Sequence, residues 1–290
     1  MRISKYFTKK RSLTGLLVIV TLVFIGMLAE AIFDSYEEYK EKVAFSQLAP
    51  DFISMCLKDA EDRGNNDVIL GRIRQCVHNN SVHNIDEEFY QHWRAPTSDK
   101  LRRILDFANG DMPEPPHMEC STRTEVLEDL YRYMGYQTKV YNVVQAADDF
   151  PGHILVEVFN PTTKEGELHD PTYNVSYNNF ETGKRLNAIE VLETPLNEIA
   201  YCGNAGNCSQ EEMREDEALV SDKIRDYFGF FYHKPDTGNE DGILSINKSR
   251  FDPEEKFSVK GEQMTYCEKK AKNCQNPIQF YKERTEITDL

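Results

Sequence analysis

The sequence predicts an α+β protein in which helices precede a run of antiparallel strands. Two observations predict this fold class. Apolar residues recur at helical spacing as far as residue 134, and from residue 136 onward the pattern changes to the alternation typical of β-strands. The chain has 290 residues, of which 40% are hydrophobic, so it is long and apolar enough for one packed domain with appendages.

The composition argues against several classes of protein. Lys and Arg number 34 against 49 Asp and Glu, which gives a net charge of −15. Such an acidic chain is poorly suited to neutralising phosphates, so we expect no nucleic-acid partner. The 15 Gly and 12 Pro are ordinary numbers and do not indicate a collagen-like or low-complexity chain.

Residues 1–33 are predicted to be a basic tail followed by a membrane anchor. Residues 12–29 hold no charged side chain and are just long enough to span a bilayer. The basic cluster before them should remain in the cytoplasm, which places the bulk of a single-pass protein in the periplasm or outside the cell. The alternative is a cleaved signal peptide with Ala29-Glu30-Ala31 as its small-residue site, which would give a secreted protein.

An exported chain is expected to form disulfides. Six of the seven cysteines form three pairs that are close in sequence: Cys56 and Cys76, Cys202 and Cys208, and Cys267 and Cys274. Local pairing is the simplest arrangement, although spacing alone leaves the connectivity open. Cys120 has no near neighbour and is predicted to be the free thiol.

The region 34–97 is predicted to be helical. Helices over 50–62 and 67–77 each carry one cysteine on the apolar face, so a Cys56–Cys76 disulfide would staple a helical hairpin. Another helix begins at Ser98 and ends at Asn109-Gly110, inside the predicted core 98–200. Residues 201–290 form an acidic, cysteine-containing extension with a helix-like stretch over 210–228, and the sequence does not define its role.

The centre of the core is predicted to be one helix followed by strands. Thr122 and Glu125 form a capping-box pattern directly after Cys120, and the helix continues to Gly135. Strands are predicted over 136–144, 153–159 and 167–170, with a turn at 160–166 between the last two.

Three residues of this core have the chemistry of a nucleophilic site. Cys120 lies at a helix start, where free N–H groups and the helix dipole stabilise a thiolate. His153 begins one strand and Asp170 ends its antiparallel partner, so both lie at the same sheet edge. His153 would take the thiol proton and Asp170 would orient the imidazole. Each residue alone has an ordinary structural explanation, and their order and topology together favour the site.

Three segments that carry these residues resemble the transglutaminase-like superfamily, as a bacterial-type, membrane-anchored member. They are residues 119–136 with the helix end Tyr133-Met134-Gly135-Tyr136, residues 152–158, and Leu168-His169-Asp170-Pro171-Thr172-Tyr173. The resemblance covers about residues 98–179. It implies a papain-like α+β core with a Cys-His-Asp triad, which corresponds here to Cys120, His153 and Asp170.

The chain departs from the family pattern around the cysteine. Many members have glycine two residues before the cysteine and an aromatic residue after it, where this chain has Met118 and Ser121. Some relatives use an upstream Trp or Gln beside the oxyanion, and Trp93 or Gln91 are the candidates here. These departures favour hydrolysis over amine transfer.

The same residues allow two other arrangements. His169 is an alternative orienting residue, but strand alternation allows only one of His169 and Asp170 to face His153. A metal site formed by Cys120, His117, His153 and His169 has no compact zinc spacing, so we expect neither a metal nor a cofactor.

The sequence therefore predicts an extracytoplasmic transglutaminase-like cysteine enzyme that attacks amide bonds of a protein or peptide substrate. Hydrolysis through a thioacyl intermediate is the expected reaction. The alternative is a catalytically inactive scaffold or binding module of a cell-envelope complex. An arylamine acetyltransferase-like enzyme ranks lower, since the Arg-Gly-Gly sequence expected before its cysteine is absent. The substrate, the acceptor and the oligomeric state stay open.

Overall fold

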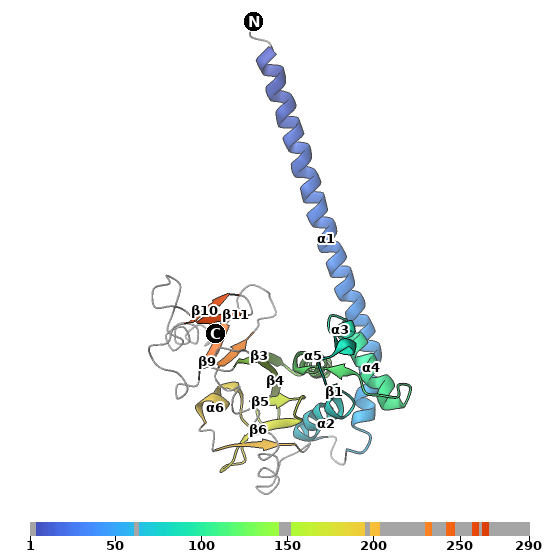
Figure 1. Cartoon of the computed structure of the whole chain (residues 1–290), viewed down its shortest axis with the longest axis vertical. Coiled ribbons are helices and arrows are strands. Elements are labelled where there is room, and N and C mark those ends of the chain that lie inside the picture. Colours follow the sequence, from blue (N-terminus) through green and yellow to red (C-terminus); the bar gives the residue numbers. More distant parts are fainter. Residues whose placement is uncertain are drawn as a thin grey trace. The chain divides into compact units, whose positions relative to one another are not determined.

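The computed structural model describes the backbone of residues 4–60, 64–144, 152–194, 198–203, 230–233, 242–246, 257–260 and 263–266. Side chains are described within residues 20–203, with gaps. The chain divides into two compact units, Met1–Gln47 and Leu48–Leu290. Figure 1 gives the labels of the helices and strands.

Helix α1 (Ser4–Cys56) includes most of the first unit. Exposed pairs of opposite charge support it one turn apart, with Lys42 Nζ 2.6 Å from Glu38 Oε1 and Lys40 Nζ 3.0 Å from Glu37 Oε1. Among the helices searched, which are those with described residues, none is long and apolar enough to cross a membrane. The predicted span 12–29 begins in residues whose side chains lie outside the described part, so the anchor stays a prediction.

The predicted helix over 50–62 is wrong at both ends. The helix is already formed before Pro50 and ends at Cys56. Proline suits the first turn of a helix and therefore suggested a start. The preceding turns carry charge pairs that favour a helix, and the helix continues through Pro50, with Ala49 and Phe52 fully buried.

Helix α2 (Asn66–Asn79) confirms the second predicted helix, and Asn65 caps it by accepting the Asp67 N–H at 3.0 Å. The Cys56–Cys76 disulfide is confirmed, with a Cα–Cα distance of 5.6 Å. Cys202 is also disulfide-bonded. Cys208, Cys267 and Cys274 lie outside the described residues, as does the predicted helix over 210–228.

The next elements include a short helix and a parallel strand pair that the sequence did not predict. Helix α3 (Glu87–His92) begins where the Asp86 carboxylate accepts the Phe89 N–H at 3.1 Å. Strand β1 (Val82–His83) pairs in parallel with β2 (His117–Met118). Helix α4 (Thr97–Asn109) ends as predicted at Gly110, whose φ of 83° is the left-handed cap that favours glycine.

Helix α5 (Cys120–Tyr133) confirms the predicted helix, but its cap is Glu119 rather than Thr122. Thr122 and Glu125 do not form the capping box, because the Thr122 hydroxyl instead accepts the Glu119 N–H at 2.9 Å. The helix therefore starts three residues earlier than a cap at Thr122 would allow, and Cys120 is its first helical residue.

The α+β class is confirmed by a seven-stranded antiparallel sheet in the order β7-β6-β5-β4-β3-β8-β9. The three predicted strands are confirmed as β3 (Thr138–Val144), β4 (Gly152–Asn160) and β5 (Glu165–Asp170). The other strands of the sheet are β6 (Val175–Asn179), β7 (Ile199–Cys202), β8 (Phe230–His233) and β9 (Gly242–Ile246). The extension thus adds β8 to the core sheet beside β3. Strands β10 (Phe257–Lys260) and β11 (Gln263–Tyr266) form a separate antiparallel pair.

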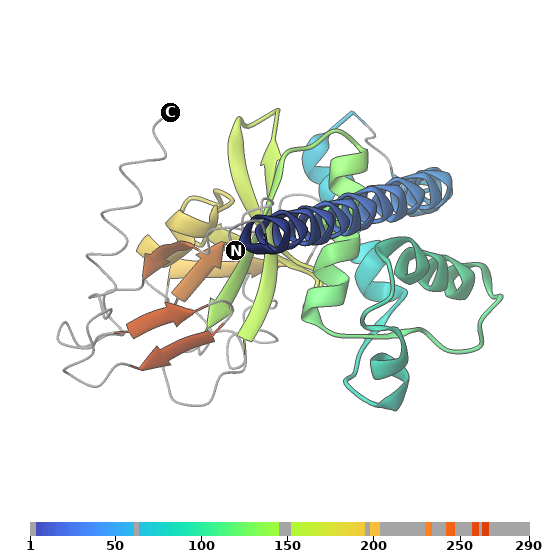
Figure 2. The same ribbon diagram turned by 90° about the horizontal axis from the view of Figure 1, so that it is seen from above.

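Helices cover both faces of this sheet. Helix α5 packs against β3 and β4, with α2 and α4 beside it (Figure 1, Figure 2). Helix α6 (Ala188–Glu193) contributes to an apolar cluster on the other face, which includes Tyr141, Leu155, Leu168 and Tyr177 from four neighbouring strands. Because side chains alternate across a strand, these residues point away from α5. This layering brings the start of α5 to the sheet edge where β4 begins and β5 ends.

Candidate functional site

The hairpin β4–β5 brings His153 and Asp170 into direct contact. His153 is the second residue of β4 and Asp170 is the last of β5, so the antiparallel pairing places them at the same edge. The His153 Nε2 atom lies 2.7 Å from Asp170 Oδ2. His153 is 4% exposed and Asp170 is fully buried, so the pair is shielded from water.

The Asp170 carboxylate is held from all sides by donors. Its Oδ1 atom accepts the N–H groups of Thr172 at 2.8 Å and Tyr173 at 3.2 Å. Its Oδ2 atom accepts the Tyr177 hydroxyl at 3.2 Å, besides contacting His153. Burial acts to raise the pKa of Asp170, but the charge of His153 and these hydrogen bonds outweigh it and lower the pKa. The carboxylate is therefore fixed in orientation and ionised.

The surroundings of His153 stabilise its protonated, imidazolium form. Burial acts to lower its pKa, but the charge and hydrogen bond of Asp170, together with a hydrogen bond to Cys120, raise the pKa to about 10. Since Nε2 contacts Asp170, the Nδ1 atom is the ring nitrogen left for the thiol.

Cys120 is a free, half-buried thiol at the start of α5. Burial acts to raise its pKa, but hydrogen bonds from the rings of His153 and His83, the charge of His153 and the backbone N–H of Ile154 lower the pKa to about 7. Cys120 at the start of α5 therefore lies near the hydrogen-bonded His153–Asp170 pair.

Helix α5 is docked onto this edge by two of its buried side chains. The Thr124 hydroxyl donates to the Ile154 carbonyl at 3.0 Å, which fixes the helix beside the residue after His153. The Arg123 guanidinium donates to the carbonyls of Thr172 at 3.1 Å and Ser81 at 2.6 Å. Burial lowers the pKa of Arg123 to about 10, so it is still a cation at neutral pH. These contacts hold the helix start, the Asp170 turn and the start of β1 together.

His83, one of the groups that lower the Cys120 pKa, was not predicted from the sequence. Trp93 or Gln91 was predicted to have an auxiliary role, but Trp93 packs near Phe89 and under the Arg94 guanidinium, and Gln91 is exposed. Trp93 also lines a small pocket with Met118 and Thr122, and Cys120 is not among the described residues that line it. No local signal marks His83, because it reaches Cys120 through the pairing of two short strands far apart in sequence.

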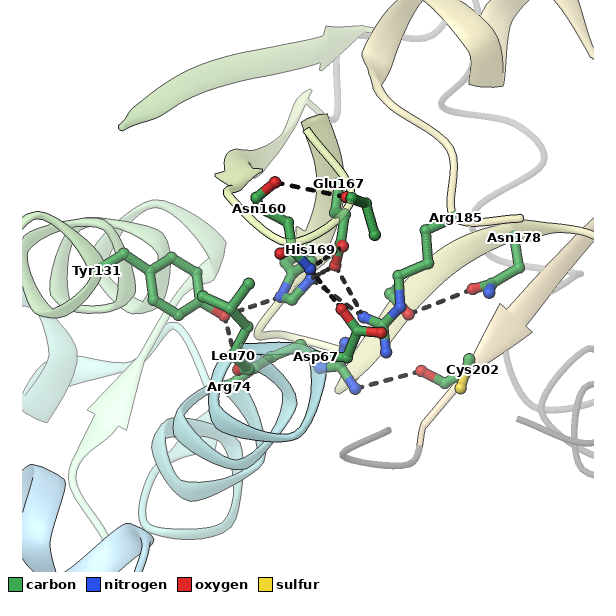
Figure 3. Close-up of polar contacts among 12 residues, drawn as sticks. Asp67, Leu70, Arg74, Tyr131, Asn160, Glu167, His169, Asn178, Arg185 and Cys202 are labelled. Carbon is green, nitrogen blue, oxygen red and sulfur yellow. Dashed lines mark hydrogen bonds and ion pairs between the residues drawn. The ribbon is translucent and has the colours of Figure 1, made fainter. Parts of the chain in front are cut away.

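His169, the alternative orienting residue, points to the other face of β5. Its Nδ1 atom lies 2.8 Å from the Tyr131 hydroxyl, inside a buried polar network with Glu167 and Arg185 (Figure 3). Burial and the nearby arginines keep the pKa of His169 well below its ordinary value, so the ring is neutral. Of His169 and Asp170, only Asp170 contacts His153.

Two of the four residues of the alternative metal site, His117 and His169, contact other groups instead of the Cys120–His153 pair. His117 contacts the Asp86 carboxylate at 2.7 Å, and His169 belongs to the network on the opposite face. Within the described part of the chain, no group of three or more His, Cys, Asp or Glu side chains is arranged to hold a metal ion.

The function of this site has to be inferred from its own geometry. The chain matches no protein-family model, no curated protein and no solved structure.

Proposed function

We propose that this protein is an extracytoplasmic cysteine hydrolase of the transglutaminase-like type, which cleaves amide bonds in a protein or peptide substrate. The observation that carries the proposal is the buried His153–Asp170 hydrogen bond of 2.7 Å, next to a free Cys120 whose pKa is lowered chiefly by His153. The resemblance to the transglutaminase-like superfamily and the helix-on-antiparallel-sheet arrangement support a papain-like core for it.

The relative acidities of the two reacting groups support this chemistry. A thiol pKa of about 7 lies below the imidazolium pKa of about 10, so the thiolate–imidazolium form of the pair dominates between these two pH values. The thiolate is the nucleophilic form of cysteine. Asp170 stabilises the adjacent imidazolium and fixes its orientation.

In the first half of the reaction, the Cys120 thiolate attacks the substrate carbonyl carbon and a carbon–sulfur bond forms. The carbonyl π electrons move onto oxygen. When they return, the carbon–nitrogen bond breaks and the His153 imidazolium gives its proton to the departing amine. The products of this step are a free amine and a thioester on Cys120.

In the second half, neutral His153 takes a proton from water as the water oxygen attacks the thioester. Collapse of this adduct releases the carboxylic acid and restores the thiolate–imidazolium pair. The sum is one amide and one water converted to one acid and one amine. The departures at Met118 and Ser121 from the family pattern favour water as the acceptor.

Residues 12–29 are proposed to anchor this enzyme in the membrane, with the basic tail in the cytoplasm. Extraction tests the anchor: the full chain should require detergent, whereas a chain that starts at residue 34 with a cleavable export signal should be soluble without it. Recovery of the full chain in the carbonate-soluble fraction would contradict the anchor.

Alkylation by iodoacetamide as a function of pH tests the enzyme proposal on the non-reduced protein, with peptide mass spectrometry as the readout. We expect Cys120 to react with a midpoint near pH 7, well below the ordinary thiol pKa of about 8.5. His153→Ala should abolish the low-pH reaction. The matched control His117→Ala, three residues before the cysteine, should leave it unchanged.

Resistance of Cys120 to alkylation, or reaction only at alkaline pH in both the wild type and His153→Ala, would exclude the enzyme. That outcome would favour the inactive scaffold of a cell-envelope complex instead.

A further inference from the structure

A small pocket borders the segment that carries the candidate nucleophile. Its wall includes Met118 and Thr122, which lie two residues before and two residues after Cys120. Helices α3 and α4 supply other parts of the wall. A group bound in this pocket would therefore lie close to a substrate bound at Cys120.

The pocket is basic, although the chain is acidic overall. Lys100 and Arg103 line it, and none of the described lining residues is Asp or Glu. The whole chain has 49 acidic residues against 34 basic ones, so a wall without a carboxylate departs from the composition. Two histidines of the wall already have partners: His92 contacts the Arg103 guanidinium, and His117 Nδ1 lies 2.7 Å from Asp86 Oδ2. The lining therefore suits an anionic group bound by Lys100 and Arg103.

The two cations have more N–H donors than their contacts use. The Lys100 ammonium has three donors, and its Nζ atom contacts Glu125 Oε2 at 2.5 Å. The Arg103 guanidinium has five donors, and it contacts His92 and, at 3.4 Å, Glu88 Oε1. The Lys100 side chain is 7% exposed, whereas that of Glu125 is 51% exposed, so the water-facing partner is the carboxylate. Donors are thus left for a second carboxylate, to which charge-assisted hydrogen bonds are strong.

The rest of the wall is apolar, which restricts the kind of anion. Phe89, Pro116 and Met118 line the pocket, and Phe89 and Met118 are each only 3% exposed. Trp93 also lines it and is 39% exposed. Methylene groups pack favourably on such surfaces. The pocket therefore suits a carboxylate on a short methylene chain, which is the side chain of Asp or Glu.

We propose that this pocket is a specificity site for an acidic substrate residue, whose side-chain carboxylate accepts hydrogen bonds from Lys100 and Arg103. The residue in question is the one whose carbonyl carbon bonds to Cys120. Its Cα atom is bonded to the reacting carbon, so its side chain starts close to the sulfur and to the wall at residues 118 and 122. The inference rests on the proposed function, because it names the substrate class of the same site.

The net charge of −15 does not prevent an acidic peptide from binding here. At physiological salt, exposed charges farther away than about 8 Å are largely screened. A contact with the buried Lys100 ammonium is screened much less. The local pair therefore decides the preference for an acidic side chain.

The test uses two alkylating peptides on the full chain, solubilised in detergent at pH 7.5. They are acetyl-Ala-Ala-Glu chloromethyl ketone and its counterpart with Gln in place of Glu. In both, the thiolate displaces chloride, so that a carbon–sulfur bond forms and the carbon–chlorine bond breaks. Peptide mass spectrometry gives the labelling rate of Cys120. The ratio of the Glu rate to the Gln rate cancels any change in the thiolate fraction and isolates the carboxylate.

We expect the Glu peptide to label wild-type Cys120 about 10²-fold faster, as hydrogen bonds from charged groups imply. Lys100→Met and Arg103→Met should each lower the ratio about 10-fold, and the double variant should bring it close to 1. Arg103→Lys, which keeps a cation, should retain most of the ratio. Arg102→Met is the matched control, because Arg102 is the exposed neighbour on α4 and is not among the described lining residues. It should leave the ratio unchanged.

Iodoacetamide checks that each variant keeps an intact site, with a midpoint of alkylation near pH 7. If Lys100→Met fails this check, Arg103→Met decides, because the Arg103 side chain is 28% exposed and tolerates replacement better.

A wild-type ratio near 1, or a ratio that is the same in Arg103→Met and in the wild type, would overturn the specificity site. Normal labelling by iodoacetamide would then leave the proposed function standing. If neither iodoacetamide nor the peptides label wild-type Cys120 near neutral pH, the proposed function fails, and the specificity site fails with it.

Discussion

The His153 Nε2 atom lies 2.7 Å from Asp170 Oδ2, and the other oxygen of the same carboxylate accepts two backbone N–H groups. The two oxygens of Asp170 therefore have different tasks. Oδ1 fixes the turn at Thr172 and Tyr173, and Oδ2 faces the imidazole. A substituted side chain at this position inherits this orientation, since the two backbone donors require an acceptor.

Asp170→Asn should inactivate the site without removing a hydrogen-bonding group. The backbone N–H groups hold the amide oxygen, so the NH₂ group faces Nε2. Nε2 must then accept, which puts the proton of the neutral ring on Nδ1, where it blocks transfer from the thiol. Loss of the carboxylate also lowers the His153 pKa, so the Cys120 pKa rises. We expect the midpoint of Cys120 alkylation to move from about pH 7 toward about 8.5 and turnover to fall about 10³-fold.

Tyr177→Phe is the control, because it removes one donor to Oδ2 and leaves the contact with His153 in place. Its alkylation midpoint should stay close to that of the wild type. A midpoint that is the same in Asp170→Asn and in the wild type would show that Asp170 does not act on His153.

Arg123 is predicted to support the site through backbone carbonyls. Arg123→Met leaves the buried Thr172 and Ser81 carbonyls without the guanidinium donors that now serve them. Loss of hydrogen bonds from a charged group should lower the free energy of unfolding by about 3 kcal/mol, measured by urea denaturation. Arg132→Met, at the exposed end of the same helix, removes a surface ion pair with Glu128 and an exposed hydrogen bond to the Thr138 hydroxyl, and should change the free energy of unfolding by less than about 1 kcal/mol. Equal effects of the two substitutions would rule out this role for Arg123.

The sequence predicted that His153 and Asp170 meet at one sheet edge and that Cys120 lies at a helix start, because each position follows from a local pattern. A helix start, a strand start and a strand end are readable from periodicity, and a short turn forces the two strand positions to one edge. Alternation also separated His169 from Asp170, since adjacent residues of β5 face opposite sides.

The parts that were missed depend on contacts between distant segments. His83 reaches Cys120 only because two-residue strands pair across more than thirty residues, and such short strands have no periodicity to detect. Likewise β8 joins β3 from within the acidic extension, so the boundary of the core at residue 200 did not anticipate it. The capping box predicted at Thr122 is not formed, because Glu119, the residue directly after β2, caps the helix instead.

The buried network around Glu167 should be a major source of stability on the α5 face (Figure 3). Arg185 Nη1 lies 3.1 Å from Glu167 Oε2, with both side chains almost fully buried. Arg185→Met leaves the Glu167 carboxylate without this cation, which should cost about 3–5 kcal/mol in the free energy of unfolding. The neighbouring Lys184→Met removes ion pairs with Glu165 and Glu190 that are partly exposed, and should cost less than about 1 kcal/mol.

A double variant separates the ion pair from simple loss of packing. The double variant Glu167→Gln, Arg185→Met should lose less free energy of unfolding than the two single variants lose in sum. Each single variant leaves one buried charge unpaired, whereas the double variant removes both charges. Additive losses would show that the two charges are not coupled.

The Cys56–Cys76 disulfide should stabilise the second unit without affecting the chemistry of Cys120. It closes a segment of 20 residues and ties the end of α1 to α2. Restriction of the unfolded chain by a loop of this length contributes about 3 kcal/mol. We expect the double variant Cys56→Ser, Cys76→Ser to lower the free energy of unfolding by about that amount in urea denaturation of the non-reduced protein.

The alkylation midpoint of Cys120 in this double variant should stay near pH 7, since neither cysteine contacts His153 or Asp170 among the described interactions. Cys120→Ser is the control for loss of a sulfur that is not cross-linked, and it should leave the stability nearly unchanged. A loss of stability in Cys120→Ser equal to that in the double variant would show that the cross-link itself contributes nothing.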